Sequence, residues 1–172
     1  MSKSKYRLPD INQWHEPDFV NLFGAVYEHS PWVAAEAWLD RPFASTDHLH
    51  NLMDGVVKRA GQSRQLTLIK AHPELAGRLV RSAELTPESR SEQAQAGLSS
   101  LSEDLTRRML ELNAVYQQKF GFPFIICARL NNVATILEAM QHRLTNSSET
   151  EFKTALQEIS KIAKLRLADI IE

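Results

Sequence analysis

The sequence contains one cysteine, Cys127, among 172 residues. A lone cysteine excludes an intrachain disulfide and any zinc site built from several thiolates. A surplus of charge of either sign is also missing, because 20 lysines and arginines face 21 aspartates and glutamates, for a formal net charge of −1. Such a chain has no general attraction for a phosphate backbone. We therefore expect no nucleic acid partner.

Long apolar runs are absent too. No stretch of the sequence approaches the roughly 20 apolar residues that a helix needs to cross a bilayer. Residues 1–7 carry positive charge, but no apolar segment follows them as it would in a secretory signal. A Gly-rich phosphate loop, a dinucleotide fingerprint and a His-Glu-x-x-His motif are likewise missing. We expect a soluble, cytoplasmic protein with no membrane partner, no nucleotide cofactor and no metal.

Apolar residues recur at helical spacing through almost the whole chain. Together with capping residues, this spacing predicts helices within 18–27, 30–39, 45–61, 62–71, 86–97, 101–121, 132–140 and 148–172. The short apolar run 122–128 fits either a buried extended segment or the start of a buried helix. With no repeat and no linker, we predict a single domain over residues 1–172, an all-α irregular bundle of about eight helices.

A histidine occurs where one predicted helix must stop. Pro73 lacks a backbone N–H and disfavours helical geometry in the residue before it, so the helix over 62–71 should end at His72. An imidazole titrates near neutral pH. His72 is therefore either a proton-transfer group facing a cleft or a hydrogen-bonded helix stop. Cys127, within an apolar run, is expected to be a small core residue rather than a nucleophile.

Two other helices carry polar side chains in unusual places. In the last helix, Arg166 is the one charge on a stripe formed by Phe152, Leu156, Ile159, Ala163 and Ile170. A buried guanidinium must be paired, so Arg166 forms either a structural ion pair or an anion-recognition site. In the helix over 86–97, one face is lined by Ser89, Glu92, Gln93 and Ala96. That face is either solvated surface or a partner for the nearby His72.

These features occur within motifs by which the chain resembles a known family, the 2-oxo-4-hydroxy-4-carboxy-5-ureidoimidazoline (OHCU) decarboxylases of urate catabolism. The motifs occur in order at Ala71 to Gly77, Leu85 to Leu98, Asn113 to Cys127 and Glu158 to Leu167. The resemblance extends from about Phe19 to the C-terminus. It implies an all-α, cofactor-free and typically homodimeric enzyme that converts the ureidoimidazoline into (S)-allantoin and carbon dioxide.

The resemblance also implies roles for particular residues. His72 looks like the catalytic acid/base, and Glu92 looks like its carboxylate partner. The residues that resemble substrate-binding groups or the pocket wall are Pro73, Ser89, Gln93, Phe124, Ile125, Ile126 and Arg166. Two alternatives remain open at this stage: a non-catalytic helical binding module, and an enzyme that acts on a related ureide.

Overall fold

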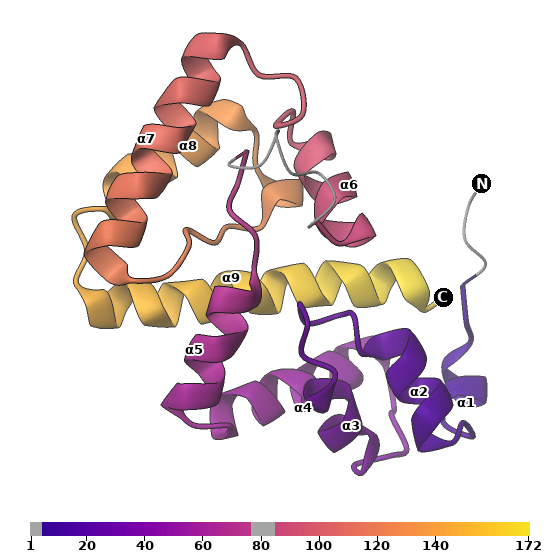
Figure 1. The fold of residues 1–172 in the computed structure, drawn as a ribbon. Helices are drawn as coiled ribbons and strands as arrows, with labels where there is room; N and C mark the ends of the chain where they lie inside the picture. The colour runs from indigo at the N-terminus through magenta and orange to yellow at the C-terminus, as the bar shows by residue number, and fades with distance from the viewer. Residues whose placement is uncertain (1–4, 77–84) are drawn as a thin grey trace. The chain divides into compact units, whose positions relative to one another are not determined.

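A computed structural model describes residues 5–76 and 85–172 (Figure 1). Within these ranges the regular structure is α-helical, apart from one 3-10 turn and one isolated β-bridge, which confirms the all-α prediction. Gly77, at the end of the first motif, lies outside the described residues. Contacts divide the chain into two units, Met1–Ala71 with Ser160–Glu172, and His72–Ile159. The single domain over residues 1–172 stays a prediction.

The first unit is built on short amphipathic helices and an aromatic core. Its helices are α1 (Leu8–Ile11), α2 (Glu16–Phe23), α3 (Trp32–Trp38), α4 (Thr46–Arg59) and α5 (Gln62–Ala71). Phe19 lies between two other rings, with centroids 4.6 Å from Phe23 and 5.5 Å from Phe43. α3 packs against α2 and α4. The predicted helix over 18–27 ends earlier than expected, at Phe23, and one turn at α1 was not predicted.

The second unit contains the longer helices and one irregular segment. Its elements are α6 (Pro87–Gln95), α7 (Glu103–Phe120), the 3-10 turn η2 (Ala128–Leu130) and α8 (Val133–Arg143). The ring of Tyr116 on α7 packs edge-on against Phe124, with the centroids 5.3 Å apart. α7 ends at Phe120, and the capping residue Gly121 has a φ of +76°. Residues 122–127 of the ambiguous run, here called the extended segment, form neither a helix nor a paired strand, and they are buried, whereas Ala128 begins η2.

The last helix, α9 (Ser148–Ile170), begins in the second unit, and its residues from Ser160 onward belong to the first. Three residues of its predicted apolar stripe, Phe152, Leu156 and Ile170, are only partly buried. Two carboxylates on this helix, Glu151 and Glu158, are buried instead. The prediction that Arg166 is the one charge on the buried face is therefore wrong. The carboxylates tolerate burial because each accepts hydrogen bonds inside the second unit.

Candidate active site

His72 follows directly after α5, as the Pro73 break predicts. α5 ends at Ala71, and His72 is only 7% exposed. The segment that follows, Pro73 to Ala76, is irregular, and Ala76 adopts a φ of +50° that L residues rarely take. A strained backbone persists only where neighbouring groups hold it in place. The loop that begins at the buried His72 therefore needs support from other elements.

Two side-chain amides provide that support to the loop. Gln93 on α6 accepts a hydrogen bond from the Ala76 N–H at 3.1 Å and donates one to the Glu74 carbonyl at 3.3 Å. Asn113 on α7 donates to the Leu75 carbonyl at 2.8 Å. Three consecutive residues after Pro73 are therefore tied to two helices. Asn113 was not among the predicted site residues, although it interrupts a buried row on α7 that includes Met109 and Tyr116.

The predicted polar face of α6 is the buried side of this helix. Ser89 and Ala96 are buried and Glu92 and Gln93 are partly buried, whereas their neighbours Ser91 and Gln95 are exposed. The helix begins where the sequence indicates, with the Thr86 side chain accepting a hydrogen bond from the Ser89 N–H at 3.2 Å and Pro87 in the first turn. The reading of this face as solvated surface is wrong.

α6 also packs against η2, which follows the extended segment 122–127. Burial raises the pKa of the Cys127 thiol, and the carboxylates of Glu158 and Glu92 raise it further. Glu92 thus lies within electrostatic range of the end of this segment. The thiol stays protonated near neutral pH, which agrees with a core cysteine and not with a nucleophile. Within the second unit, the His72 loop, the polar face of α6 and the extended segment therefore come together.

Arg166 belongs to the first unit and forms the structural ion pair. Its Nη1 lies 3.0 Å from Glu28 Oε2, with the two side chains 4% and 1% exposed. The same nitrogen donates to the carbonyls of Ala25 and Val26 at 3.3 Å. Glu28 follows α2 in an irregular turn, so no periodic pattern marked it as buried. The substrate-binding role of Arg166 stays a prediction.

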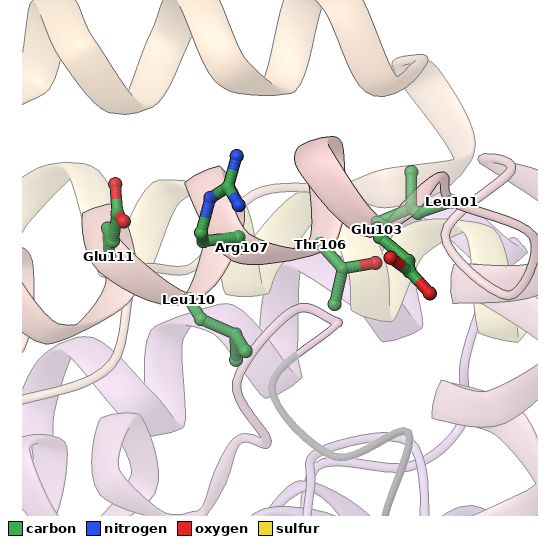
Figure 2. A pocket seen from close by; sticks show the side chains of 6 residues that line it. All are labelled: Leu101, Glu103, Thr106, Arg107, Leu110 and Glu111. Carbon is green, nitrogen blue, oxygen red and sulfur yellow. The ribbon is translucent and has the colours of Figure 1, made fainter.

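Two hollows on the described surface lie elsewhere. The larger, about 520 Å³, runs along the N-terminal half of α7, where Figure 2 shows its lining side chains: Leu101, Glu103, Thr106, Arg107, Leu110 and Glu111. A smaller one of about 370 Å³ in the first unit includes His50 and Lys164. Neither contains a predicted site residue.

The described residues contain neither a cluster of metal-binding side chains nor a helix that could span a membrane. They hold no group of three or more histidine, cysteine, aspartate or glutamate side chains placed to bind a metal ion. None of the helices in these ranges is both long enough and apolar enough to span a bilayer.

Comparison with known proteins identifies the family. A sequence model described as OHCU decarboxylase matches residues 12–168. A relative from Haloferax volcanii, named 2-oxo-4-hydroxy-4-carboxy-5-ureidoimidazoline decarboxylase, is 43% identical over 162 residues, which cover 94% of this chain and 94% of that protein.

Two solved structures are similar as well. One, described as (S)-allantoin synthase, has a TM-score of 0.75 at 27% identity, and covers 96% of this chain, which spans 54% of that protein. The other is an OHCU decarboxylase in the presence of (S)-allantoin, with a TM-score of 0.66 at 25% identity, covering 90% of this chain and 96% of that one. The fold and these matches define an all-α decarboxylase. The chain belongs to the OHCU decarboxylase family.

Proposed function

We propose that this protein decarboxylates 2-oxo-4-hydroxy-4-carboxy-5-ureidoimidazoline to (S)-allantoin and carbon dioxide in urate degradation, without a cofactor. The observation that carries the proposal is the pair of hydrogen bonds from Gln93 to Glu74 and Ala76. They join the helix face that holds Ser89 and Glu92 to the loop that begins at His72. The choice of substrate is based on the family to which the chain belongs.

The chemistry fits these residue types. When the bond from C4 to the carboxylate breaks, its electron pair forms a C4=C5 double bond as the electrons of the C5=N imine move to nitrogen, which takes up a proton. Protonation of C5 from one face then sets the stereocentre, and the C4 hydroxyl loses its proton to become the carbonyl. Because the substrate contains its own electron sink, the protein needs to position groups and move protons.

Each predicted residue has a role in this proposal. His72 exchanges the protons, and Glu92 orients the imidazole and contacts the ureido N–H groups. Ser89, Gln93 and Arg166 bind substrate oxygens and nitrogens. A tight salt bridge to the departing carboxylate would stabilise the ground state, so Arg166 is assigned to another oxygen. The pocket wall consists of Pro73, Phe124, Ile125 and Ile126.

The test is stereochemical. The substrate is generated in place from urate with the two upstream enzymes, and allantoin is followed by circular dichroism. We expect (S)-allantoin to form faster than the spontaneous racemic decay. His72→Ala and Glu92→Ala should each lower turnover by roughly 10²–10⁴-fold, the usual contribution of positioned proton transfer, with the far-UV spectrum retained.

His142→Ala is the matched control, because His142 is an exposed histidine in the last turn of α8. It should keep full activity. A folded wild-type protein that gives only the spontaneous trace would overturn the proposal and favour a helical binding module. A different chiral product would indicate a related ureide as substrate. The homodimer and the cytoplasmic location stay predictions from the sequence.

A further inference from the structure

The extended segment 122–127 is held by charged side chains and not by a strand. Phe124, Ile125 and Cys127 are buried, so their backbone groups need partners inside the protein. Arg143 Nη1 on α8 donates to the Ile125 carbonyl at 2.7 Å. Glu158 on α9 accepts from the Cys127 N–H at 2.8 Å. A cation and an anion from two helices thus hold the backbone on either side of Ile126.

Arg143 is itself held in a buried network. Its Nε and Nη2 lie 3.0 Å and 2.9 Å from Glu151 Oε2, and its guanidinium carbon lies 4.3 Å from the centroid of the Phe124 ring. Glu151 is fully buried and also accepts hydrogen bonds from Tyr116 and Asn146. Burying charges costs more than burying apolar groups of similar size. A network of this kind fixes geometry, because the planar fork of Arg143 binds the carboxylate and the carbonyl at once.

Ile126, between the two anchors, differs from its neighbours. It is buried, yet among the described residues no hydrogen bond reaches its amide N–H or its carbonyl oxygen. Buried backbone groups are nearly always paired. The two anchors bind one end of each of the two peptide groups that flank the Ile126 Cα, and leave the Ile126 N–H and carbonyl without a partner among the described residues. A planar ureide, rich in N–H and C=O groups, is complementary to these two groups.

We propose that Arg143 and Glu158 are positioning residues for the decarboxylation: they set the orientation of the Ile126 backbone groups toward the substrate. This inference rests on the proposed function. Neither side chain is assigned a contact with the substrate. Their effect passes through the Ile125 carbonyl and the Cys127 amide, so their loss should displace the wall of the pocket and leave the proton-transfer residues in place.

The test compares Glu158→Leu with Glu158→Gln. Leucine removes the acceptor of the Cys127 N–H, whereas the glutamine oxygen can still accept it. We expect Glu158→Leu to lower kcat/KM by roughly 10- to 100-fold and to reduce the enantiomeric excess of allantoin, because small displacements at a reaction centre have effects of that size. Glu158→Gln should restore most of the activity. Glu149→Leu, on the exposed side of α9, is the matched control.

Arg143→Lys covers the case in which Glu158→Leu does not fold. Lysine keeps the charge beside Glu151 but cannot bind that carboxylate and the Ile125 carbonyl together. It should lower kcat/KM in folded protein. Folded variants with wild-type kcat/KM and enantiomeric excess would overturn the inference, even if their thermal midpoints fall. An inactive wild-type protein would instead overturn the proposed function, so the two failures are distinguishable.

Discussion

At the scale of single residues, the ion pair between Arg166 and Glu28 is expected to have a large effect on stability. Both side chains are almost fully removed from solvent and lie 3.0 Å apart. Removing one partner of such a pair leaves a charge buried without the guanidinium that compensated it. We expect Arg166→Met to lower the free energy of unfolding by about 3–5 kcal/mol. Urea unfolding followed by far-UV circular dichroism measures this change.

A surface pair of the same type serves as the control. Arg107 Nη2 lies 2.6 Å from Asp104 Oδ1, but both side chains are exposed, so Arg107→Met should cost at most about 1 kcal/mol. Replacing both buried partners, Arg166→Met with Glu28→Met, should be less damaging than Arg166→Met alone, since no buried charge of the pair is left behind. Equal losses for Arg166→Met and Arg107→Met would contradict the argument.

Which of these charges could be found from sequence depends on their surroundings. Arg166 was found because it interrupts an apolar row, and the polar face of α6 was found by its spacing. Glu28 lies in an irregular turn, where no period marks burial. Glu151 and Glu158 are seven residues apart on the buried side of α9, but the apolar stripe of Phe152, Leu156 and Ile170 indicates a different side of the helix as buried. The groups that bind Glu151 and Glu158 belong to other elements, so the pattern of residues along α9 cannot predict these contacts.

At the scale of elements, the end of α7 decides how the extended segment begins. Gly121 has a φ of +76°, and a Cβ built there would meet nothing within 4 Å. The loss of stability on Gly121→Ala is therefore expected to come from the backbone conformation and not from a steric clash of the added methyl group. We expect a loss of about 1–2 kcal/mol, the usual cost of left-handed geometry for a residue with a Cβ. Urea unfolding measures it.

At Gly55, the same substitution to alanine is expected to raise stability instead of lowering it. It lies inside α4, and the nearest atom to an added Cβ is Arg59 Nη1 at 2.9 Å, the end of a flexible side chain that can move. Gly55→Ala should raise stability by about 0.4–1 kcal/mol, because alanine loses less backbone entropy in a helix. A loss at Gly55 as large as the loss at Gly121 would show that the contact with Arg59 outweighs the gain in backbone entropy.

The helices were predictable because their signals are local. Caps at Ser45, Thr86 and Asn132, and glycines after three helices, mark ends that the structure confirms to within a few residues. The segment 122–127 was not predictable, because a short apolar run has no period that separates strand from helix. Its extended form depends on Arg143 and Glu158, which are 18 and 31 residues away from the groups they bind.

At the scale of the whole molecule, the two units are not two consecutive halves of the sequence. The first unit combines Met1–Ala71 with Ser160–Glu172, and the second consists of the residues between them. Within the first unit, the Tyr6 N–H donates to the Ile170 carbonyl at 2.8 Å, which joins the two ends of the sequence. Composition and periodicity carry no signal for such a pairing, so the sequence predicted the helices but not their division between units.

The stability of the whole protein should decrease at low pH because Glu151 becomes protonated. Burial raises the pKa of this carboxyl, but hydrogen bonds from Arg143, Tyr116 and Asn146 outweigh that effect and hold the pKa below its ordinary value of 4.5. Since the folded pKa is the lower one, ionised Glu151 contributes its full stability above about pH 4.5, and this contribution is lost as the pH falls through the folded pKa. Urea midpoints between pH 7 and pH 3 should therefore fall in acid.

Glu151→Gln tests the source of this pH dependence. It should be less stable than wild type at neutral pH, because the Arg143 guanidinium then stays buried without its anion, and the gap to wild type should narrow toward pH 3 as wild-type Glu151 takes up a proton. Glu149→Gln is the control on the same helix. The pKa of Glu149 is also lowered, by Lys153, but that pair is exposed and screened by solvent, so the variant should follow the wild-type curve. A gap between Glu151→Gln and wild type that stays constant from pH 7 to pH 3 would assign the acid sensitivity to other carboxyl groups.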